Sequence, residues 1–121
     1  LWKYIQLNKH NLNEAVIAGD FNSNSIWDEW DRWWNHTDVV NELKAYGIES
    51  IYHKITGEEH GKETKPTLYF QKKINRPYHI DYIFGPKKFA ERTKIFEIGQ
   101  VDKWLELSDH MPIFYEIETS N

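Results

Sequence analysis

The stretch Ala15-Val-Ile-Ala-Gly-Asp-Phe-Asn-Ser23 decides the fold that we expect for this chain. Its apolar first half predicts a short buried strand that a glycine ends, and Asp20 and Asn22 follow on either side of Phe21. Side chains of a strand alternate between its two faces. We therefore expect Asp20 and Asn22 to project together, while Phe21 turns into the core. Open sheets bind ligands at strand ends, which makes this pair a candidate site, although an ordinary turn has the same composition.

Two further polar islands interrupt apolar sequence. The segment Tyr78–Phe84 predicts a strand with Asp81 at its middle, and Ser108-Asp109-His110 stands directly before a last predicted strand, Ile113–Ile117. A buried carboxylate needs a partner, because an unpaired charge is costly away from water. Structural explanations stay open for both islands, since Asp109 could cap a turn and a lone histidine is usually a satisfied side chain.

The composition limits the class of protein. The chain has 121 residues, enough for one domain with a modest core, and a net charge of -4. Generic nucleic-acid binders are basic, so this charge argues against one. It does not exclude a metal-dependent enzyme acting on phosphates, because a divalent cation supplies positive charge. Cysteine is absent, which excludes disulfides and thiolate metal sites and is compatible with a cytoplasmic location.

The order of the expected elements predicts the fold class. A helix is expected over residues 38–46, and strands over 16–22, 48–53, 67–71, 78–84, 93–98 and 113–117. Consecutive strands without helices between them favour a mixed or antiparallel sheet with helices on one face, an α/β chain of the α+β type. Residues 56–65 are expected to form an exposed, mobile loop. We interpret Glu58-Glu59-His60 as its solvated tip rather than as metal ligands.

A tryptophan-rich segment follows the first strand. Trp27, Trp30 and Trp34 have the spacing of one face of a short helix. They could pack against the sheet, which we favour for at least two of the four tryptophans in this segment. They could also form an aromatic platform that stacks a base or sugar beside a site, so Trp27 is a candidate substrate-binding residue. Lys72, Lys73 and Arg76 form the most basic spot, suited to phosphate or to a solvated hairpin tip.

The three polar islands, in this order, resemble the C-terminal half of the endonuclease/exonuclease/phosphatase superfamily, which is DNase I-like. The matching motifs are Gly19-Asp20-Phe21-Asn22, His79-Ile80-Asp81-Tyr82 and Ser108-Asp109-His110. The resemblance implies half of a four-layer α-β-β-α sandwich, with residues 1–121 as a single domain that is the C-terminal portion of the family's domain. The family's metal-binding Glu, in a Gln-Glu motif, belongs to the other half and has no match here.

The resemblance also implies an activity, the metal-dependent hydrolysis of phosphate esters, as by a phosphodiesterase or nuclease. In this interpretation Asp20 orients or deprotonates the attacking water, Asn22 donates a hydrogen bond to the nucleophile or phosphate, and His110 contacts the scissile phosphate. Asp81 pairs with His110 and fixes its tautomer, and Asp109 contributes to a Mg²⁺ or Mn²⁺ site. We expect the chain alone to have little or no activity, because the metal-binding Glu is not in it.

Alternatives remain open at this point. A phosphomonoesterase acting on a nucleotide or on an inositol or lipid phosphate would use the same residues, and a non-catalytic binding module of the same fold is a further possibility. The substrate is expected to be a phosphate ester and could be nucleic acid, and no membrane span is predicted. Either the family's N-terminal half or self-association is expected to cover an exposed apolar face of the sheet.

Overall fold

The computed structural model describes residues 1–12 and 14–119. The strands are β1 (Ile17–Asp20), β2 (Ile48–Ser50), β3 (Leu68–Tyr69), β4 (Pro77–Tyr78), β5 (Asp81–Pro86), β6 (Thr93–Ile98) and β7 (Ile113–Ile117). The α-helices are α1 (Trp2–Asn8), α2 (His36–Ala45), α3 (Ile51–Thr56), α4 (Lys87–Glu91) and α5 (Val101–Trp104). Short 3-10 helices are η1 (Lys9–Asn11), η2 (Ser25–Trp27) and η3 (Phe70–Lys72). None of the helices in the described ranges is long and apolar enough to cross a membrane.

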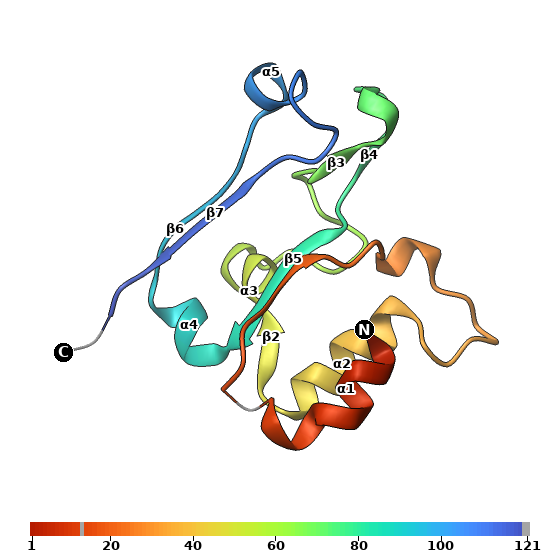
Figure 1. Cartoon of the computed structure of the whole chain (residues 1–121), viewed down its shortest axis with the longest axis vertical. Helices are drawn as coiled ribbons and strands as arrows, with labels where there is room; N and C mark the ends of the chain where they lie inside the picture. Colours follow the sequence, from red (N-terminus) through yellow and green to blue (C-terminus); the bar gives the residue numbers. More distant parts are fainter. Residues whose placement is uncertain (13, 120–121) are drawn as a thin grey trace.

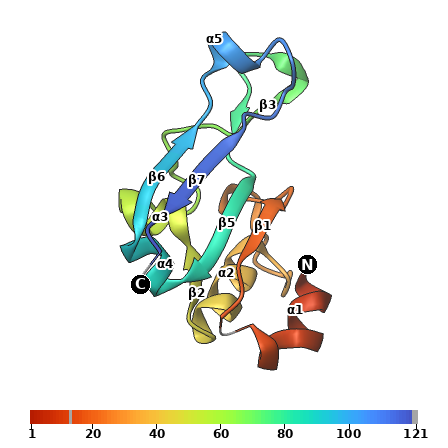
Figure 2. The same cartoon turned by 60° about the vertical axis from the view of Figure 1, so that its left-hand side comes forward.

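The strands form three antiparallel groups, as Figure 1 shows: a three-stranded sheet in the order β1-β5-β2, the pair β3-β4 and the pair β6-β7. Helices α1 and α2 lie together beside the three-stranded sheet in both views (Figures 1 and 2). The chain is therefore a mixed α+β fold with antiparallel sheets, as the order of the expected elements predicted.

The register between β1 and β5 sorts their side chains onto two faces. The facing pairs are Ile17–Phe84, Ala18–Ile83, Gly19–Tyr82 and Asp20–Asp81. Tyr82 and Phe84 are 1% and 0% exposed and belong to the core. Alternation therefore turns Asp81 and its partner Asp20 toward the opposite face.

The core lies between this sheet and the first two α-helices. Its fully packed members are Ile5, Leu12, Val39, Leu43, Ile48, Tyr82 and Phe84. The predicted helix over residues 38–46 is present as α2, which begins two residues earlier. The backbone N–H of Asn35 donates to Asp38 Oδ2 at 2.7 Å at its start, and Gly47 follows its end with a φ of 78°. Burial of one face of α2 holds the helices against the sheet.

The predicted strand over residues 48–53 is wrong in its second half. Only Ile48–Ser50 is extended, and helix α3 begins at Ile51. Gly57 ends this helix in the left-handed conformation, with its N–H bonded to the carbonyl of His53. Residues 48–53 have the apolar alternation of a strand, but the helix that Gly57 ends extends back to Ile51.

The predicted strand Tyr78–Phe84 is broken at its centre. Tyr78 ends β4 and Asp81 begins β5, and the buried Thr67 hydroxyl accepts the N–H groups of Ile80 and Asp81 at 2.9 and 3.1 Å. The ring of His79 lies 5.2 Å from that of Tyr82, although an uninterrupted strand would place these two side chains on opposite faces. Because of this break, the segment contributes β4 to the β3-β4 pair and β5 to the three-stranded sheet.

Several large apolar side chains stay exposed on or beside the strands. Val16, Ile95 and Phe114 are 47%, 42% and 46% exposed. The β6-β7 pair contacts α3 through Phe96, whose ring lies 6.0 Å from that of Tyr52, and α4 through Tyr115, whose hydroxyl donates to the carbonyl of Phe89 at 2.8 Å.

Candidate active site

Two carboxylates face each other across adjacent strands. Asp20 ends β1 and Asp81 begins β5, and the two are Cα partners in the register. Like charges directly opposite in a sheet destabilise it, so this pair has a cost that its surroundings must offset. Among the described residues, neither carboxylate forms an ion pair with a lysine or arginine, and His110 is the shared partner.

The Ser108–His110 segment reaches this pair because it lies against β3. A bridge joins Leu68 to His110, the N–H of Tyr69 donates to the carbonyl of Asp109 at 2.8 Å, and the N–H of Met111 donates to the carbonyl of Thr67 at 2.7 Å. The hydroxyl of Ser108 accepts the N–H of His110 at 3.0 Å. Backbone hydrogen bonds therefore bring two of the polar islands together, although 29 positions separate Asp81 from His110.

The predicted hydrogen bond between His110 and Asp81 is present. Nδ1 of His110 lies 3.0 Å from Oδ2 and 3.2 Å from Oδ1 of Asp81, and Nε2 lies 3.8 Å from Oδ2 of Asp20. A carboxylate at Nδ1 fixes the imidazole tautomer and leaves Nε2 free to face a ligand. The imidazole is held between the two carboxylates with one nitrogen toward each.

The surroundings perturb both members of this pair. Partial burial opposes the charged imidazole, but the hydrogen bond and the charge of Asp81 outweigh it and raise the pKa of His110. Burial raises the pKa of the Asp81 carboxyl, with a smaller contribution from Asp20, while hydrogen bonds from Thr67 and His110 oppose that rise. The pair therefore retains its proton to higher pH than an isolated histidine would.

Asn22 lies beside the carboxylates, but not in the extended conformation that the strand predicted. β1 ends at Asp20, and Asn22 has a φ of 50°. Oδ1 of Asp20 accepts the Asn22 N–H at 2.7 Å, a turn that asparagine tolerates well. Phe21 stacks on Phe84 at 5.2 Å and approaches Tyr82 at the same distance, so it anchors the strand end in the core as expected.

Asp109 does not join the compact donor group. Oxygen and nitrogen ligand atoms of Asp20, Asp81 and His110 lie within 4.8 Å of one another, and Asp109 is outside this set. Its half-buried side chain is close enough to help raise the pKa of His110. The expected contribution of Asp109 to a metal site thus rests on the sequence motif alone.

A groove of about 400 Å³ opens next to Asn22. It is lined by Asn22, Trp27, Leu68, Phe70, Arg76, Tyr78 and Ile80. The rings of Trp27 and Tyr78 are 5.2 Å apart, and the guanidinium of Arg76 lies 5.5 Å from the centre of the Phe70 ring. The groove thus combines exposed aromatic faces with one cation.

The remaining tryptophans do not form the expected helical stripe. Residues 28–34 have no helix, and Trp30, Trp33 and Trp34 are 97%, 65% and 50% exposed. Trp33 contacts Trp2 and Trp34 edge to face, at 5.9 and 5.0 Å. Packing of at least two tryptophans against the sheet, as predicted, is therefore wrong, and Trp27 alone of the four lines the groove.

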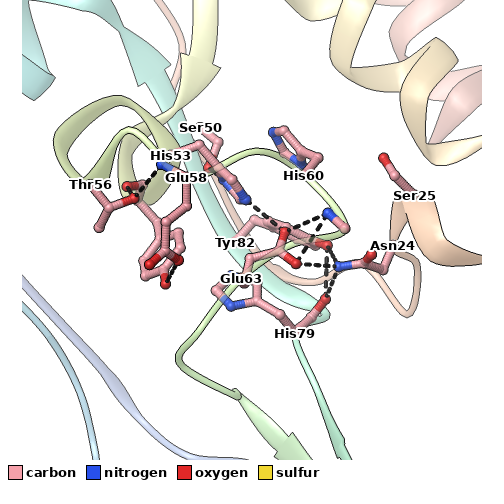
Figure 3. A network of polar contacts seen from close by, with 12 residues as sticks. Asn24, Ser25, Ser50, His53, Thr56, Glu58, His60, Glu63, His79 and Tyr82 are labelled. Carbon is pink, nitrogen blue, oxygen red and sulfur yellow. Dashed lines mark hydrogen bonds and ion pairs between the residues drawn. The ribbon is translucent and has the colours of Figure 1, made fainter.

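A second polar cluster lies on the Tyr82 side of β5, and sequence analysis missed it (Figure 3). Nε2 of His53 lies 2.7 Å from Oε2 of Glu63, and the His53 and His60 rings stack at 3.6 Å. Nδ1 of His60 lies 3.0 Å from Nε2 of His36. The side chains of His53 and Glu63 are only 8% and 4% exposed.

The loop at residues 56–65 is exposed over much of its length, as expected, but Glu58, His60, Gly61 and Glu63 are half-buried against the protein. Glu58 accepts hydrogen bonds from Tyr52 and Thr64, and Asn24 donates to Glu63 at 3.1 Å. Four of the six histidines gather around Glu63. Their positions, His36, His53, His60 and His79, share no regular spacing, and only the concentration of histidines was available as a signal.

Burial keeps three histidines of this second cluster uncharged at neutral pH. Desolvation lowers the pKa of His36 to about 4 and that of His60 to about 3, and it also lowers the pKa of His79. For Glu63, burial raises the pKa, but hydrogen bonds from His53, Asn24 and Gly61 outweigh it and lower the value to about 2. Glu63 is therefore a buried carboxylate close to uncharged imidazoles, those of His36, His60 and His79.

Comparison with known proteins places the fold. No protein-family model matches the chain, and no curated protein matches it at a significant level. Among solved structures, it matches the 3' phosphatase NExo from Neisseria, determined bound to a product DNA hairpin, with a TM-score of 0.65 and 16% identity. The match covers 97% of this chain and 50% of the other, so the chain spans about half the length of that structure.

Proposed function

We propose that this chain carries part of the active site of a metal-dependent phosphoester hydrolase of the endonuclease/exonuclease/phosphatase superfamily. The observation that supports it most is the register that sets Asp20 opposite Asp81 with His110 held between them. The likeness in fold to a 3' phosphatase supports the same superfamily. The chain would be the C-terminal portion of the domain, and residues outside it would complete the site and cover the exposed apolar surface.

Each side chain has a role that follows from its place. Asp20 accepts a proton from the attacking water or orients it. Asn22, at the mouth of the groove, donates a hydrogen bond to the nucleophile or to a phosphate oxygen. Protonated His110 contacts the phosphate through Nε2, and Asp81 is a positioning residue that holds the imidazole and favours its charged form.

The carboxylates suit a divalent cation. Two facing carboxylates that no lysine or arginine pairs with in the described part of the chain have charge to spare for a cation, and oxygen ligands favour Mg²⁺ or Mn²⁺. Asp109, the residue that the sequence motif assigns to the metal, would contribute to holding the ion beside these carboxylates. Such an ion, when bound, neutralises phosphate charge and stabilises the departing oxygen.

The groove favours a nucleic-acid substrate over a small phosphate. Trp27 and Phe70 are 44% and 43% exposed and present flat faces for a base or sugar, and stacking of one base contributes about 1–3 kcal/mol. Arg76 can bind a neighbouring phosphate. We therefore favour the end or backbone of a DNA or RNA strand as substrate, with hydrolysis of a phosphodiester or of a terminal phosphate.

The test compares this chain with a longer protein that includes the sequence encoded upstream. A DNA hairpin with a 3'-phosphate and bis-p-nitrophenyl phosphate are each incubated with Mg²⁺ or Mn²⁺. We expect turnover by the longer protein that a chelator abolishes, and little or none by the chain alone. Phosphate release from the hairpin identifies a phosphomonoesterase, and cleavage of the diester identifies a phosphodiesterase.

His110→Asn and Asp20→Asn serve as loss-of-function variants in the longer protein, and Glu116→Gln, an exposed change on β7, is the matched control. Equal turnover by this chain and by the longer protein would contradict the proposal that the site is incomplete in this chain. If the longer protein binds the hairpin but hydrolyses neither substrate, the proposed hydrolase activity is wrong and a non-catalytic binding module is favoured.

A further inference from the structure

The cluster of His53, His60 and Glu63 has no part in the proposed hydrolysis. It lies on the side of β5 that carries Tyr82, whereas Asp81 faces the other side. One ligand atom from each of the three residues lies within 4.8 Å of the others. Two imidazoles and a carboxylate are the donors that Zn²⁺ uses in three-ligand protein sites.

The neighbours of these side chains leave one ligand atom of each available. Ser50 Oγ lies 2.6 Å from Nδ1 of His53, so its Nε2 faces Glu63. Nδ1 of His60 is engaged by His36, which leaves its Nε2. Zinc-binding histidines in proteins characteristically bond an outer partner through the second ring nitrogen.

Further hydrogen bonds hold His36 and Glu63 in place. His36 Nδ1 lies 2.8 Å from the hydroxyl of Ser23, and the carboxylate of Glu63 accepts from Asn24 and from the N–H of Gly61, each at 3.1 Å. Outer-shell groups of this kind are what distinguish a built site from a chance group of donors.

The charge balance at the cluster also favours a cation. Glu63 is almost fully buried, and His53 is its sole ion-pair partner among the residues described. A buried carboxylate is costly without a counter-charge. Nearby, Nε2 of His79 is buried and has no hydrogen-bond partner in residues 1–12 and 14–119, although its ring lies 5.6 Å from that of His53.

We propose that His53, His60 and Glu63 form a binding site for Zn²⁺ or a similar first-row transition-metal ion, with His36 and Ser50 as outer partners. Imidazole donors select such ions over Mg²⁺. An imidazole nitrogen binds a metal ion in the plane of its ring. Binding of one ion by both His53 and His60 therefore requires their stacked rings to tilt apart. The bound ion pins the loop after α3 to the protein. That loop leads directly to Thr67, which holds the N–H of Asp81.

The test uses the 121-residue chain after chelator treatment, titrated with Zn²⁺ by calorimetry and with Co²⁺ by visible absorption. We expect one ion per chain, a Kd of about 1 µM or tighter, the absorption of four-coordinate Co²⁺, and a rise in Tm that Mg²⁺ does not give. Glu63→Gln and His60→Ala should weaken binding at least about 100-fold, and His36→Gln about 10–100-fold. His10→Ala, an exposed histidine on η1, is the control.

The variants also separate this site from the proposed active site. Zn²⁺ binding that survives His110→Asn but is lost in Glu63→Gln supports the proposal. Far-UV circular dichroism of each variant shows whether it is folded, and Glu63→Gln keeps the shape of the side chain. No binding below about 1 mM, or binding that only His110→Asn removes, would overturn the proposal.

Discussion

At the scale of single residues, the hydrogen bond between Asp81 and His110 controls the candidate active site. The bond is 3.0 Å long, and both its charge and its geometry favour the protonated imidazole. Asp81 would thus affect the reaction through the protonation and orientation of His110, without contacting the substrate. Its contribution should therefore appear in the titration of His110 as well as in turnover.

Replacing Asp81 by Asn should lower the pKa of His110. The charge and hydrogen bond that raise this pKa in the wild type are removed. If protonated His110 is required, activity falls as pH rises through its pKa, so this limb of the pH profile should shift to lower pH in the variant. NMR titration of the imidazole measures the shift directly, and turnover should fall by about 10²–10⁴-fold. An unchanged titration of His110 would contradict the role of Asp81.

Trp27 is the residue whose change should separate binding from chemistry. Trp27→Ala removes a flat face from the groove but leaves Asp20, Asp81 and His110 in place. We expect the KM for a DNA hairpin in the longer protein to rise by about 5–150-fold, the equivalent of about 1–3 kcal/mol of stacking, with kcat little changed. Trp30→Ala, at a side chain that is 97% exposed, is the control. Equal effects of Trp27→Ala and Trp30→Ala on KM would contradict the proposal that the groove binds the substrate.

At the scale of elements, α2 connects the core to both polar clusters. Leu43 is fully buried under the sheet, while His36 begins the same helix and contacts His60. Loss of packing at one turn of this helix should therefore loosen the loop that carries His60.

Leu43→Ala should lower the free energy of unfolding by about 2–5 kcal/mol, because it leaves a cavity at a site with no solvent exposure. Urea unfolding followed by circular dichroism measures the change. Lys44→Ala, the next and exposed position of the same helix, should change it by less than about 0.5 kcal/mol. A small loss at Leu43 would mean that α2 packs less tightly than described.

Sequence patterns were sufficient for some elements and not for others. Strand alternation predicts that Asp81 is an acid in need of a partner, and the resemblance to a known family names His110 as that partner. The end of β1 at Asp20 could not be predicted, because the turn at Asn22 depends on its local hydrogen bond to Asp20. Helix α3 could not be predicted either, since Gly57 and local hydrogen bonds override an apolar alternation. The break before β5 depends on Thr67, which lies 13 positions from Ile80, a contact that no local pattern announces.

At the scale of the whole molecule, long-range contacts create the features that the sequence does not reveal. Asn24 reaches Glu63 over 39 positions and the carbonyl of His79 over 55. The bond to Glu63 holds one side of a loop against the protein, although local composition predicts the whole loop to be exposed. The histidine cluster is therefore a property of the folded chain, and global unfolding should release all of its members together.

Stability of the chelator-treated chain should consequently fall in mild acid. The pKa values of His36 and His60 are about 4 and about 3 in the fold, against 6.5 when unfolded. Nearby carboxylates of Asp28 and Glu63 oppose these shifts only in part. Between pH 6.5 and 4 the unfolded state binds more protons, so stability is complete above pH 6.5 and falls as pH decreases.

Each of these two histidines contributes up to about 1.4 kcal/mol per pH unit in that range. Urea midpoints at pH 7.5 and pH 5 measure the loss. His36→Gln should reduce the difference between the two midpoints, and His10→Gln should not. A midpoint that rises between pH 7.5 and pH 5 would contradict the burial of neutral histidines.

The alternation of β5 also bears on how such a chain can evolve. Asp81 and Tyr82 are neighbours in sequence but serve opposite faces, one with the proposed hydrolytic residues and one with the histidine cluster. Insertion or deletion of a single residue within this strand would exchange the two faces. Homologues should therefore keep the length of β5 fixed while they vary the loops around it.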